Sequence, residues 1–275
     1  MDSDQWKLAS LQYLEHLGKL GIRHLPKPSA KLQDMLVEWK SVDPVINPAV
    51  ASKAKPPSTP VTSAPSAKIP MGPPVESPWL TPAKNPQERI AVLSQLKVKV
   101  EACRLCHELA CQRKQTVFGV GPVTTRFVMV GEAPGAEEDR IGDPFVGPAG
   151  QLLDKILIAT GIPRDQVYIL NTIKCRPPGN RVPSDSESEN CRPFLEAQLE
   201  ILQPDYIVCW GAVAVRAILG TTESIGRLRG RFHWYKKSKV LVTYHPSYLL
   251  RAPEAKKLTW EDMKTLMREL GTLKP

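Results

Sequence analysis

The residues best suited to chemistry gather in one acidic segment rich in Gly and Pro. After Val130 it reads Gly131-Glu132-Ala133-Pro134-Gly135-Ala136-Glu137-Glu138-Asp139, and its Gly and Pro residues continue to Gly150. The apolar run Phe127–Val130 before it predicts a buried strand. The composition that follows predicts a loop at the strand's carboxyl end, where open α/β sheets bind ligands. A solvated acidic turn is the alternative, but Phe145 within the Gly/Pro frame favours a shaped pocket.

Two other predicted strands also end in polar side chains. Val167–Leu170 is followed by Asn171, whose amide offers a donor and an acceptor that could read the edge of a base. Val240–Tyr244 is followed by His245, which could donate a hydrogen bond to a developing anion. A turn-forming Asn and a structural His are the alternatives. Because the three strand ends bring an acid, an amide and an imidazole together, we predict one site at this rim.

The cysteines have the spacing of a metal site. The chain has six of them, at Cys103, Cys106, Cys111, Cys175, Cys191 and Cys209. Cys103 and Cys106 are separated by two residues, as in many zinc and iron–sulfur sites. Cys175 and Cys191 would complete a set of four thiolates, with Cys111 as a rival for one place. The last cysteine lies in an apolar run and is expected in the core. Spacing alone leaves zinc and a [4Fe–4S] cluster both open.

The pattern of strands and helices predicts an α/β fold. Four β-type runs are expected, at 127–131, 167–171, 206–210 and 240–244. Helical patterns lie around and between them, at 86–102, 149–160, 186–202, 212–219 and 259–270, the last with Thr259 as its N-cap. Helical crossovers connect parallel strands. We therefore predict a three-layer α/β/α sandwich with a central, mainly parallel four-stranded sheet.

The chain is expected to have three parts. Residues 1–40 are expected to form a short helical segment, and residues 41–84 a disordered linker rich in Pro, Ser and Ala. Residues 85–275 are expected to form the folded domain. The formal net charge of +9 favours a polyanionic partner. A basic and aromatic run at 227–237 suits phosphate contacts, or is a solvated hairpin. No apolar run is long enough for a membrane span and no signal peptide is evident, so a cytoplasmic protein is expected.

Taken together, the motifs resemble those of family 4 uracil-DNA glycosylases, the iron–sulfur branch of that superfamily. The resemblance rests on Gly131-Glu-Ala-Pro-Gly135 with Glu137-Glu138-Asp139, on Asn171, and on His245-Pro-Ser-Tyr-Leu249. It covers about residues 85–270. It implies that uracil is removed from DNA to leave an abasic site, the first step of base-excision repair. It also implies a [4Fe–4S] cluster bound by Cys103, Cys106, Cys175 and Cys191.

The resemblance also implies roles for single residues. Phe145 would stack on the flipped uracil, Asn171 would bind its Watson–Crick edge, and His245 would stabilise the departing anion. Glu138 would lie beside C5 and exclude the methyl group of thymine, and Leu249 would be the wedge that enters the DNA helix.

The expected pocket is completed by four residues of the first motif: Gly131, Glu132, Ala133 and Gly135. Gly135 stands where related families place a Tyr, and Ala133 stands where another branch has a water-activating Asp. The general base is therefore left unassigned, with Glu132 as the nearest candidate.

Other functions remain open on the sequence alone. A non-catalytic iron–sulfur DNA-binding or polymerase-accessory protein could share the fold, and so could a redox carrier. A glycosylase of other specificity is a further alternative. A covalent mechanism would need an inserted basic loop before His245, and Lys236–Tyr244 leaves no room for one. Uracil-containing DNA is the expected partner, a repair or replication protein could bind the N-terminal segment, and we expect a monomer.

Overall fold

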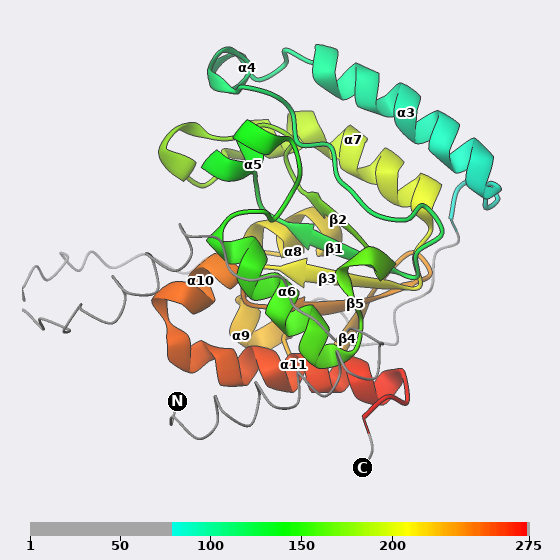
Figure 1. Cartoon of the computed structure of the whole chain (residues 1–275), viewed down its shortest axis with the longest axis vertical. Coiled ribbons are helices and arrows are strands. Elements are labelled where there is room, and N and C mark those ends of the chain that lie inside the picture. The colour runs from blue at the N-terminus through cyan, green and yellow to red at the C-terminus, as the bar shows by residue number, and fades with distance from the viewer. Residues whose placement is uncertain (1–78, 274–275) are drawn as a thin grey trace, which may run out of the picture. The chain divides into compact units, whose positions relative to one another are not determined.

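A computed structural model describes residues 79–273 of the chain, and a twisted sheet lies at its centre (Figure 1). The strands are β1 (Phe127–Gly131), β2 (Val167–Asn171), β3 (Tyr206–Trp210), β4 (Phe232–Tyr235) and β5 (Ser238–Thr243). The sheet has five strands in the order β2-β1-β3-β5-β4. All neighbours pair in parallel except β4 and β5, which are antiparallel. The mainly parallel α/β architecture is confirmed, with one strand more than predicted.

The additional strand comes from the basic and aromatic run. β4 lies at the edge of the sheet and its residues are only partly buried. Arg231 precedes it and Lys236 and Lys237 follow it, so this short segment lacks the uninterrupted apolar run by which the other strands were predicted. The alternative of a basic hairpin describes this segment correctly, since β4 turns directly into β5.

Helices cover both faces of the sheet. They are α3 (Pro86–Ala102), α4 (His107–Gln112), α5 (Ala136–Ile141), α6 (Pro148–Thr160), α7 (Asp185–Leu202), α8 (Ala212–Leu219), α9 (Ile225–Leu228), α10 (Pro246–Arg251) and α11 (Lys256–Glu269). Val128 and Val130 point into a core with α3, α7 and α8. Phe127 and Met129 point to the other face, against α6 and α11. This alternation along one strand produces the three layers.

Two local predictions were wrong. The segment after β1 is not all loop, because α5 begins at Ala136. The Gly135 N–H donates a hydrogen bond to the Glu138 carboxylate at 3.1 Å and so caps the start of this helix. A side-chain acceptor at the third helical position can start a helix even after Pro and Gly. The last helix begins at Lys256 rather than after Thr259. Thr259 is buried within it and its hydroxyl group lies 3.2 Å from that of Thr243.

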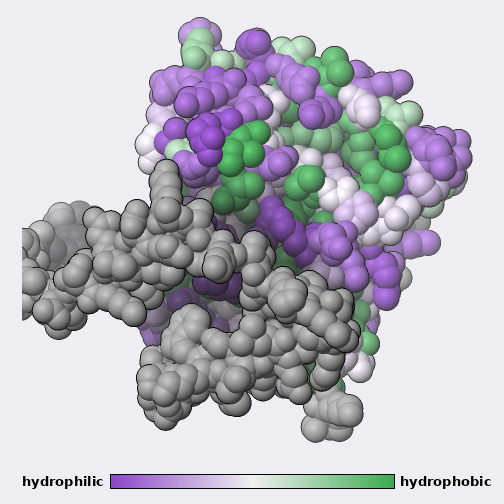
Figure 2. All heavy atoms as spheres, in the orientation of Figure 1, coloured by the Kyte–Doolittle hydropathy of each residue, from purple (hydrophilic) through white to green (hydrophobic). Residues whose placement is uncertain are grey.

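The predicted helical segment and most of the predicted linker lie outside the described residues. The end of that linker contacts the domain, since the backbone N–H of Thr81 donates to Glu200 of α7 at 2.7 Å. Trp79 packs edge-on against Tyr235 of β4, with ring centroids 6.0 Å apart. Figure 2 shows hydrophilic residues over most of the visible face, with small apolar groups between them. Within residues 79–273, no helix has the length and apolarity required to cross a membrane.

Candidate active site

The carboxyl ends of β1, β2, β3 and β5 border one cavity of about 1050 Å³. Gly131 and Asn171 are register partners at the ends of β1 and β2, and the N–H of Gly211 after β3 donates to the Thr243 carbonyl at 3.0 Å. The sheet therefore sets the positions of the residues that follow each strand. The sequence-predicted residues that line the cavity are Glu132, Ala133, Gly135, Glu138, Phe145, Asn171 and His245.

Phe145 is held in an unusual backbone conformation at the bottom of this cavity. Its φ is +53°, and its side chain is only 5% exposed. Arg164 donates to the Phe145 carbonyl at 3.1 Å and to the Pro144 carbonyl at 2.7 Å, which fixes the loop. A β-carbon at Gly150 would lie 1.8 Å from the Phe145 carbonyl oxygen. The loop can approach α6 only because residue 150 is a glycine.

The Phe145 ring faces the imidazole of His245, with ring centroids 5.6 Å apart and planes inclined by 35°. A β-carbon at Gly131 would lie 2.5 Å from the Phe145 ring and 2.4 Å from Asn171 Oδ1. Gly131 therefore gives both side chains their space. The sequence predicted these four residues for one site, and the structure brings them together.

Two polar atoms of the site are buried without a hydrogen-bond partner among the described residues: Asn171 Oδ1 and His245 Nε2. Unsatisfied buried polar atoms are unfavourable for stability, so each such atom in a folded protein needs an explanation. Because both residues line the same cavity, a planar ligand with polar edges could satisfy both atoms.

The surroundings of His245 fix its protonation. The Ser247 N–H donates to Nδ1 at 3.2 Å, so Nδ1 is an acceptor and the proton of the neutral ring lies on Nε2. Burial, together with the nearby charge of Arg251, lowers the pKa of His245 to about 4, and the charge of Glu138 partly opposes this change. The imidazole is therefore a neutral donor at neutral pH.

The two acidic residues of the site have different surroundings. The Glu138 carboxylate accepts hydrogen bonds from the N–H groups of Val146 and Gly147, both at 2.9 Å, in addition to that of Gly135. It thereby ties the start of α5 to the loop that follows Phe145. Glu132 is partly buried, and burial raises the pKa of its carboxyl group while Arg251 lowers it. Glu132 also lines the cavity, and its carboxylate accepts no hydrogen bond from the described residues.

The predicted wedge residue is placed differently from the expectation. Leu249 lies on the buried side of α10 and is 0% exposed, so in this conformation it cannot enter a DNA helix. The motif match aligned it by position, but the helical turn that begins at Pro246 directs residue 249 inward. The neighbouring Leu250 and Tyr248 are 46% and 41% exposed and line the rim of the cavity.

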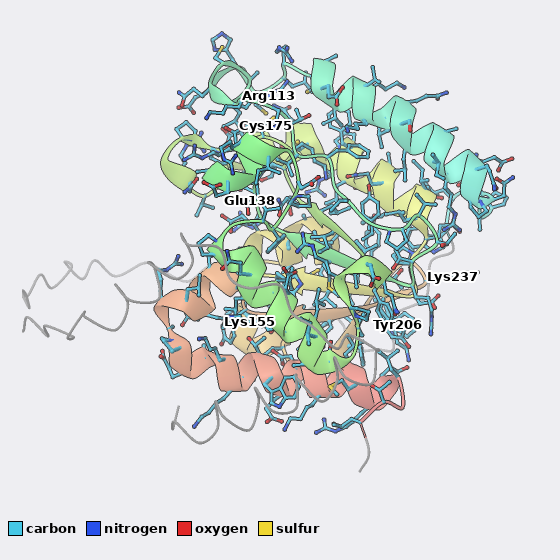
Figure 3. The ribbon with its side chains drawn as sticks, viewed as in Figure 1. Arg113, Glu138, Lys155, Cys175, Tyr206 and Lys237 are labelled. Carbon is cyan, nitrogen blue, oxygen red and sulfur yellow. The ribbon has the colours of Figure 1, made fainter. Side chains whose placement is uncertain are left out.

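Three of the four predicted ligand cysteines share a small apolar cluster with Leu109 and Ile173: Cys106, Cys175 and Cys191. Cys103 is close enough to influence the pKa of Cys175, which burial raises. Arg113 donates to Cys175 Sγ at 2.8 Å (Figure 3), and Asn190 lies 3.5 Å from Cys106 Sγ. Donors aimed at sulfur are typical of the surroundings of thiolate ligands.

The other two cysteines lie apart from this group. Cys209 is 0% exposed within β3, which confirms that it belongs to the core. Cys111 is exposed on α4, where its sulfur lies 3.7 Å from His107 Nε2. Among residues 79–273, no three Cys, His, Asp or Glu side chains converge closely enough to hold a single metal ion.

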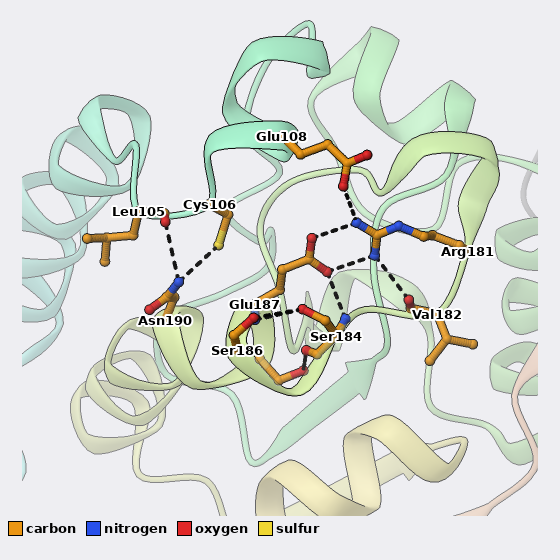
Figure 4. A network of polar contacts seen from close by, with 10 residues as sticks. Leu105, Cys106, Glu108, Arg181, Val182, Ser184, Ser186, Glu187 and Asn190 are labelled. Carbon is orange, nitrogen blue, oxygen red and sulfur yellow. Dashed lines mark hydrogen bonds and ion pairs between the residues drawn. The ribbon is translucent and has the colours of Figure 1, made fainter.

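An ion-pair network joins the cysteine region to the wall of the cavity (Figure 4). Arg181, which lines the cavity, donates to both carboxylate oxygens of Glu187 on α7 at 2.7 and 2.9 Å. It also donates to Glu108 on α4 at 2.6 Å. The hydrogen bonds from Arg181 lower the pKa of Glu187 to about 2. Because α4 follows Cys106 and α7 contains Cys191, the network links the wall of the cavity to two cysteine-bearing elements.

Sequence reasoning missed three residues of the site. Ser247 fixes the tautomer of His245, and Arg251 lowers the pKa values of His245 and Glu132. Lys174 is 1% exposed and donates to the Asn171 carbonyl at 2.8 Å. Its only signal in the sequence is its place between the apolar Ile173 and Cys175, where a solvated lysine would not be expected.

Comparisons with known proteins agree with this site. Residues 118–264 match the family model of the uracil DNA glycosylase superfamily. The type-4 uracil-DNA glycosylase of Thermotoga maritima is 44% identical over 182 residues, which cover 65% of this chain and 93% of that protein. The type-4 uracil-DNA glycosylase of Archaeoglobus fulgidus is 38% identical over 191 residues, which cover 66% of this chain and 96% of that protein. The chain therefore belongs to the uracil DNA glycosylase superfamily and, within it, to the type-4 uracil-DNA glycosylases.

Proposed function

We propose that this type-4 uracil-DNA glycosylase hydrolyses the N-glycosidic bond of uracil in DNA with Asn171 and His245 as its main catalytic side chains. The observation that carries the proposal is the pair of buried, unpartnered atoms in one cavity, Asn171 Oδ1 and His245 Nε2. Uracil has a polar edge of O2, N3–H and O4. It could satisfy both atoms once it has left the base stack.

Recognition of the base is assigned to Asn171 and Phe145. The side-chain oxygen Oδ1 of Asn171 would accept a hydrogen bond from N3–H of uracil, and its side-chain NH2 group would donate one to O4. Cytosine presents an unprotonated N3 and an amino group at these places, so it would meet the wrong polarity at both. The Phe145 ring would stack on the face of the base, since every base has a π-face.

His245 would act when the bond breaks. The electron pair of the C1′–N1 bond leaves with uracil, and its negative charge is shared between N1 and O2. The neutral imidazole would donate its Nε2–H to O2 and stabilise that charge. A preorganised donor in a site shielded from water can supply a large part of the rate enhancement. The sugar is left as an oxocarbenium-like cation.

Glu132 is the proposed partner of the water molecule. Its carboxylate lies in the cavity and its pKa is raised by burial, so it is a better proton acceptor than a solvated glutamate. The water oxygen would form the bond to C1′ and its proton would pass to Glu132. The uracil anion would take up a proton from solvent as it leaves, and Glu132 would return its proton to solvent. Glu138 is proposed to border C5 and exclude a methyl group while it holds the Phe145 loop.

A [4Fe–4S] cluster is proposed on Cys103, Cys106, Cys175 and Cys191. Each thiolate of such a cluster binds a different iron, so the sulfur atoms need not converge on one point. The donor set fits, because Arg113 and Asn190 direct N–H groups at two of the four sulfur atoms. When bound, the cluster would supply a rigid link between the segments that carry the cysteines. We assign it no part in breaking the bond.

A cleavage assay tests the proposal. A labelled oligonucleotide with one uracil is compared with the same strand carrying thymine or cytosine, and abasic sites are revealed with alkali. We expect release of uracil alone, and His245→Ala is expected to lower kcat by about 100-fold or more with little loss of DNA affinity. No cleavage by protein that binds DNA would contradict the proposal and favour a non-catalytic DNA-binding protein on this fold.

A further inference from the structure

Asp262 of α11 is a buried carboxylate that the proposed reaction does not use. It is 0% exposed, and it is not among the residues that line the cavity. A carboxylate removed from water is strongly unfavourable unless cations and hydrogen-bond donors compensate for the lost hydration. Asp262 therefore needs partners, and two different segments of the chain supply them.

The first partner is Arg229, which follows α9. Its Nη2 lies 3.0 Å from Asp262 Oδ1, and its Nε donates to Oδ2 at 3.1 Å. It also donates to the carbonyl of Leu258 on α11. Arg229 belongs to the basic run 227–237, for which the sequence predicted phosphate contacts or a solvated hairpin. Its side chain is only 17% exposed, so this arginine is committed to α11 rather than to solvent.

The second partner is Thr243, the last residue of β5. Its hydroxyl group donates to Asp262 Oδ2 at 2.8 Å. The Thr243 carbonyl in turn accepts the N–H of Gly211, at 3.0 Å. A β-carbon at Gly211 would lie 3.0 Å from Cβ of His245, so the histidine passes close to this glycine. The end of β5 is therefore held between β3 and α11, two residues before His245.

We propose that Asp262 is a positioning residue for His245: its carboxylate, paired with Arg229, holds the Thr243 hydroxyl group and so fixes the point at which the chain leaves β5 toward the imidazole. This inference rests on the proposed function, because it takes the role of His245 from it. It adds that a residue outside the cavity determines where the Nε2–H donor lies. Small displacements of a reacting group have large effects on rate.

Two variants remove different parts of this arrangement. Thr243→Val keeps a β-branched side chain and leaves the ion pair in place, but it removes the hydroxyl group. Asp262→Asn removes the charge that pairs with Arg229 and keeps one oxygen acceptor. Thr243→Ser, which keeps the hydroxyl group, is the conservative control. The kcat and KM for uracil-containing DNA are measured for each variant, both alone and combined with His245→Ala.

We expect T243V and D262N each to lower kcat by about tenfold with an unchanged KM, as for the loss of one hydrogen bond to a charged group. T243S should keep the wild-type kcat. Combined with H245A, neither variant should lower kcat further, because the imidazole that it would misplace is absent. A tenfold loss that persists in the H245A background, or a rise in KM in place of the fall in kcat, would overturn the inference.

Glu200→Gln is the matched control. Glu200 forms an ion pair with Lys236, with side chains 17% and 19% exposed, and Lys236 precedes β5 whereas His245 follows it. E200Q is expected to lower the Tm but not kcat, and a kcat as low as that of D262N would count against positioning. If D262N does not fold, T243V carries the same test. Failure of the proposed function is distinguishable, because H245A alone would then keep the wild-type kcat.

Discussion

The backbone N–H and the hydroxyl group of Ser247 both reach Nδ1 of His245, at 3.2 and 2.8 Å. Because the N–H can only donate, Nδ1 must accept, and the ring turns its protonated Nε2 toward the cavity. Ser247→Ala keeps the N–H and removes the hydroxyl group. We expect a fall in kcat of about tenfold or less with an unchanged KM, measured by single-turnover cleavage. A loss as large as that of His245→Ala would show that the hydroxyl group itself takes part in the reaction.

The acid limb of the pH–rate profile should belong to Glu132. Burial raises its pKa, so as pH falls it takes up a proton earlier than a solvated glutamate and can no longer accept one from water. The imidazole of His245 stays neutral until about pH 4, which leaves the Nε2 donor intact over that range. Glu132→Gln is expected to lower kcat and to flatten this limb. An acid limb that persists in E132Q would assign it to another group.

We expect the stability of the protein to depend on pH through the protonation of His245. Its pKa is lowered in the folded state, so the unfolded chain binds the proton more readily. The free energy of unfolding is therefore expected to have its full value above the ordinary histidine pKa of about 6.5. It should fall as the pH drops from there toward 4. Urea unfolding at several pH values measures this. His245→Gln should lose less stability over the same interval.

Gly131 should be intolerant of any side chain. The β-carbon of Gly131→Ala would meet both Asn171 Oδ1 and the Phe145 ring at about 2.5 Å or less, so both groups must move. We expect a fall in kcat/KM of about 100-fold or more, since small displacements of reacting groups have such effects. Gly161→Ala is the control: its φ is +73° and no atom lies within 4 Å of the added carbon. It should lower stability by about 1 kcal/mol and leave cleavage unchanged.

The two leucines of α10 should respond in opposite ways. Leu250→Ala removes an exposed side chain at the rim and is expected to impair cleavage of uracil in duplex DNA more than in single strands, where no base need be displaced. Leu249→Ala removes a buried side chain and is expected to lower stability by about 2–5 kcal/mol. Kinetics on both substrates and thermal unfolding distinguish them. Equal effects of L250A on both substrates would exclude a wedge role.

Most of the fold could be predicted from the sequence, because β1, β2 and β3 are continuous apolar runs that end in Gly, Asn or Trp. The positions of Asn171 and His245 followed from the rule that parallel strands end at one rim. Leu249 could not be placed in this way, since one residue along a helical turn decides between the core and the solvent. Ser247 and Lys174 act through backbone and side-chain hydrogen bonds that no spacing in the sequence reveals.

The order of the strands has a consequence for how activity arises during folding. Asn171 ends β2 at one edge of the sheet, whereas His245 follows β5, and β1 and β3 lie between them. A chain that has paired only its first two strands has the amide without the imidazole. The two catalytic side chains therefore come to one cavity only when β1 and β3 join β2 to β5, so the complete site depends on the pairing of four strands.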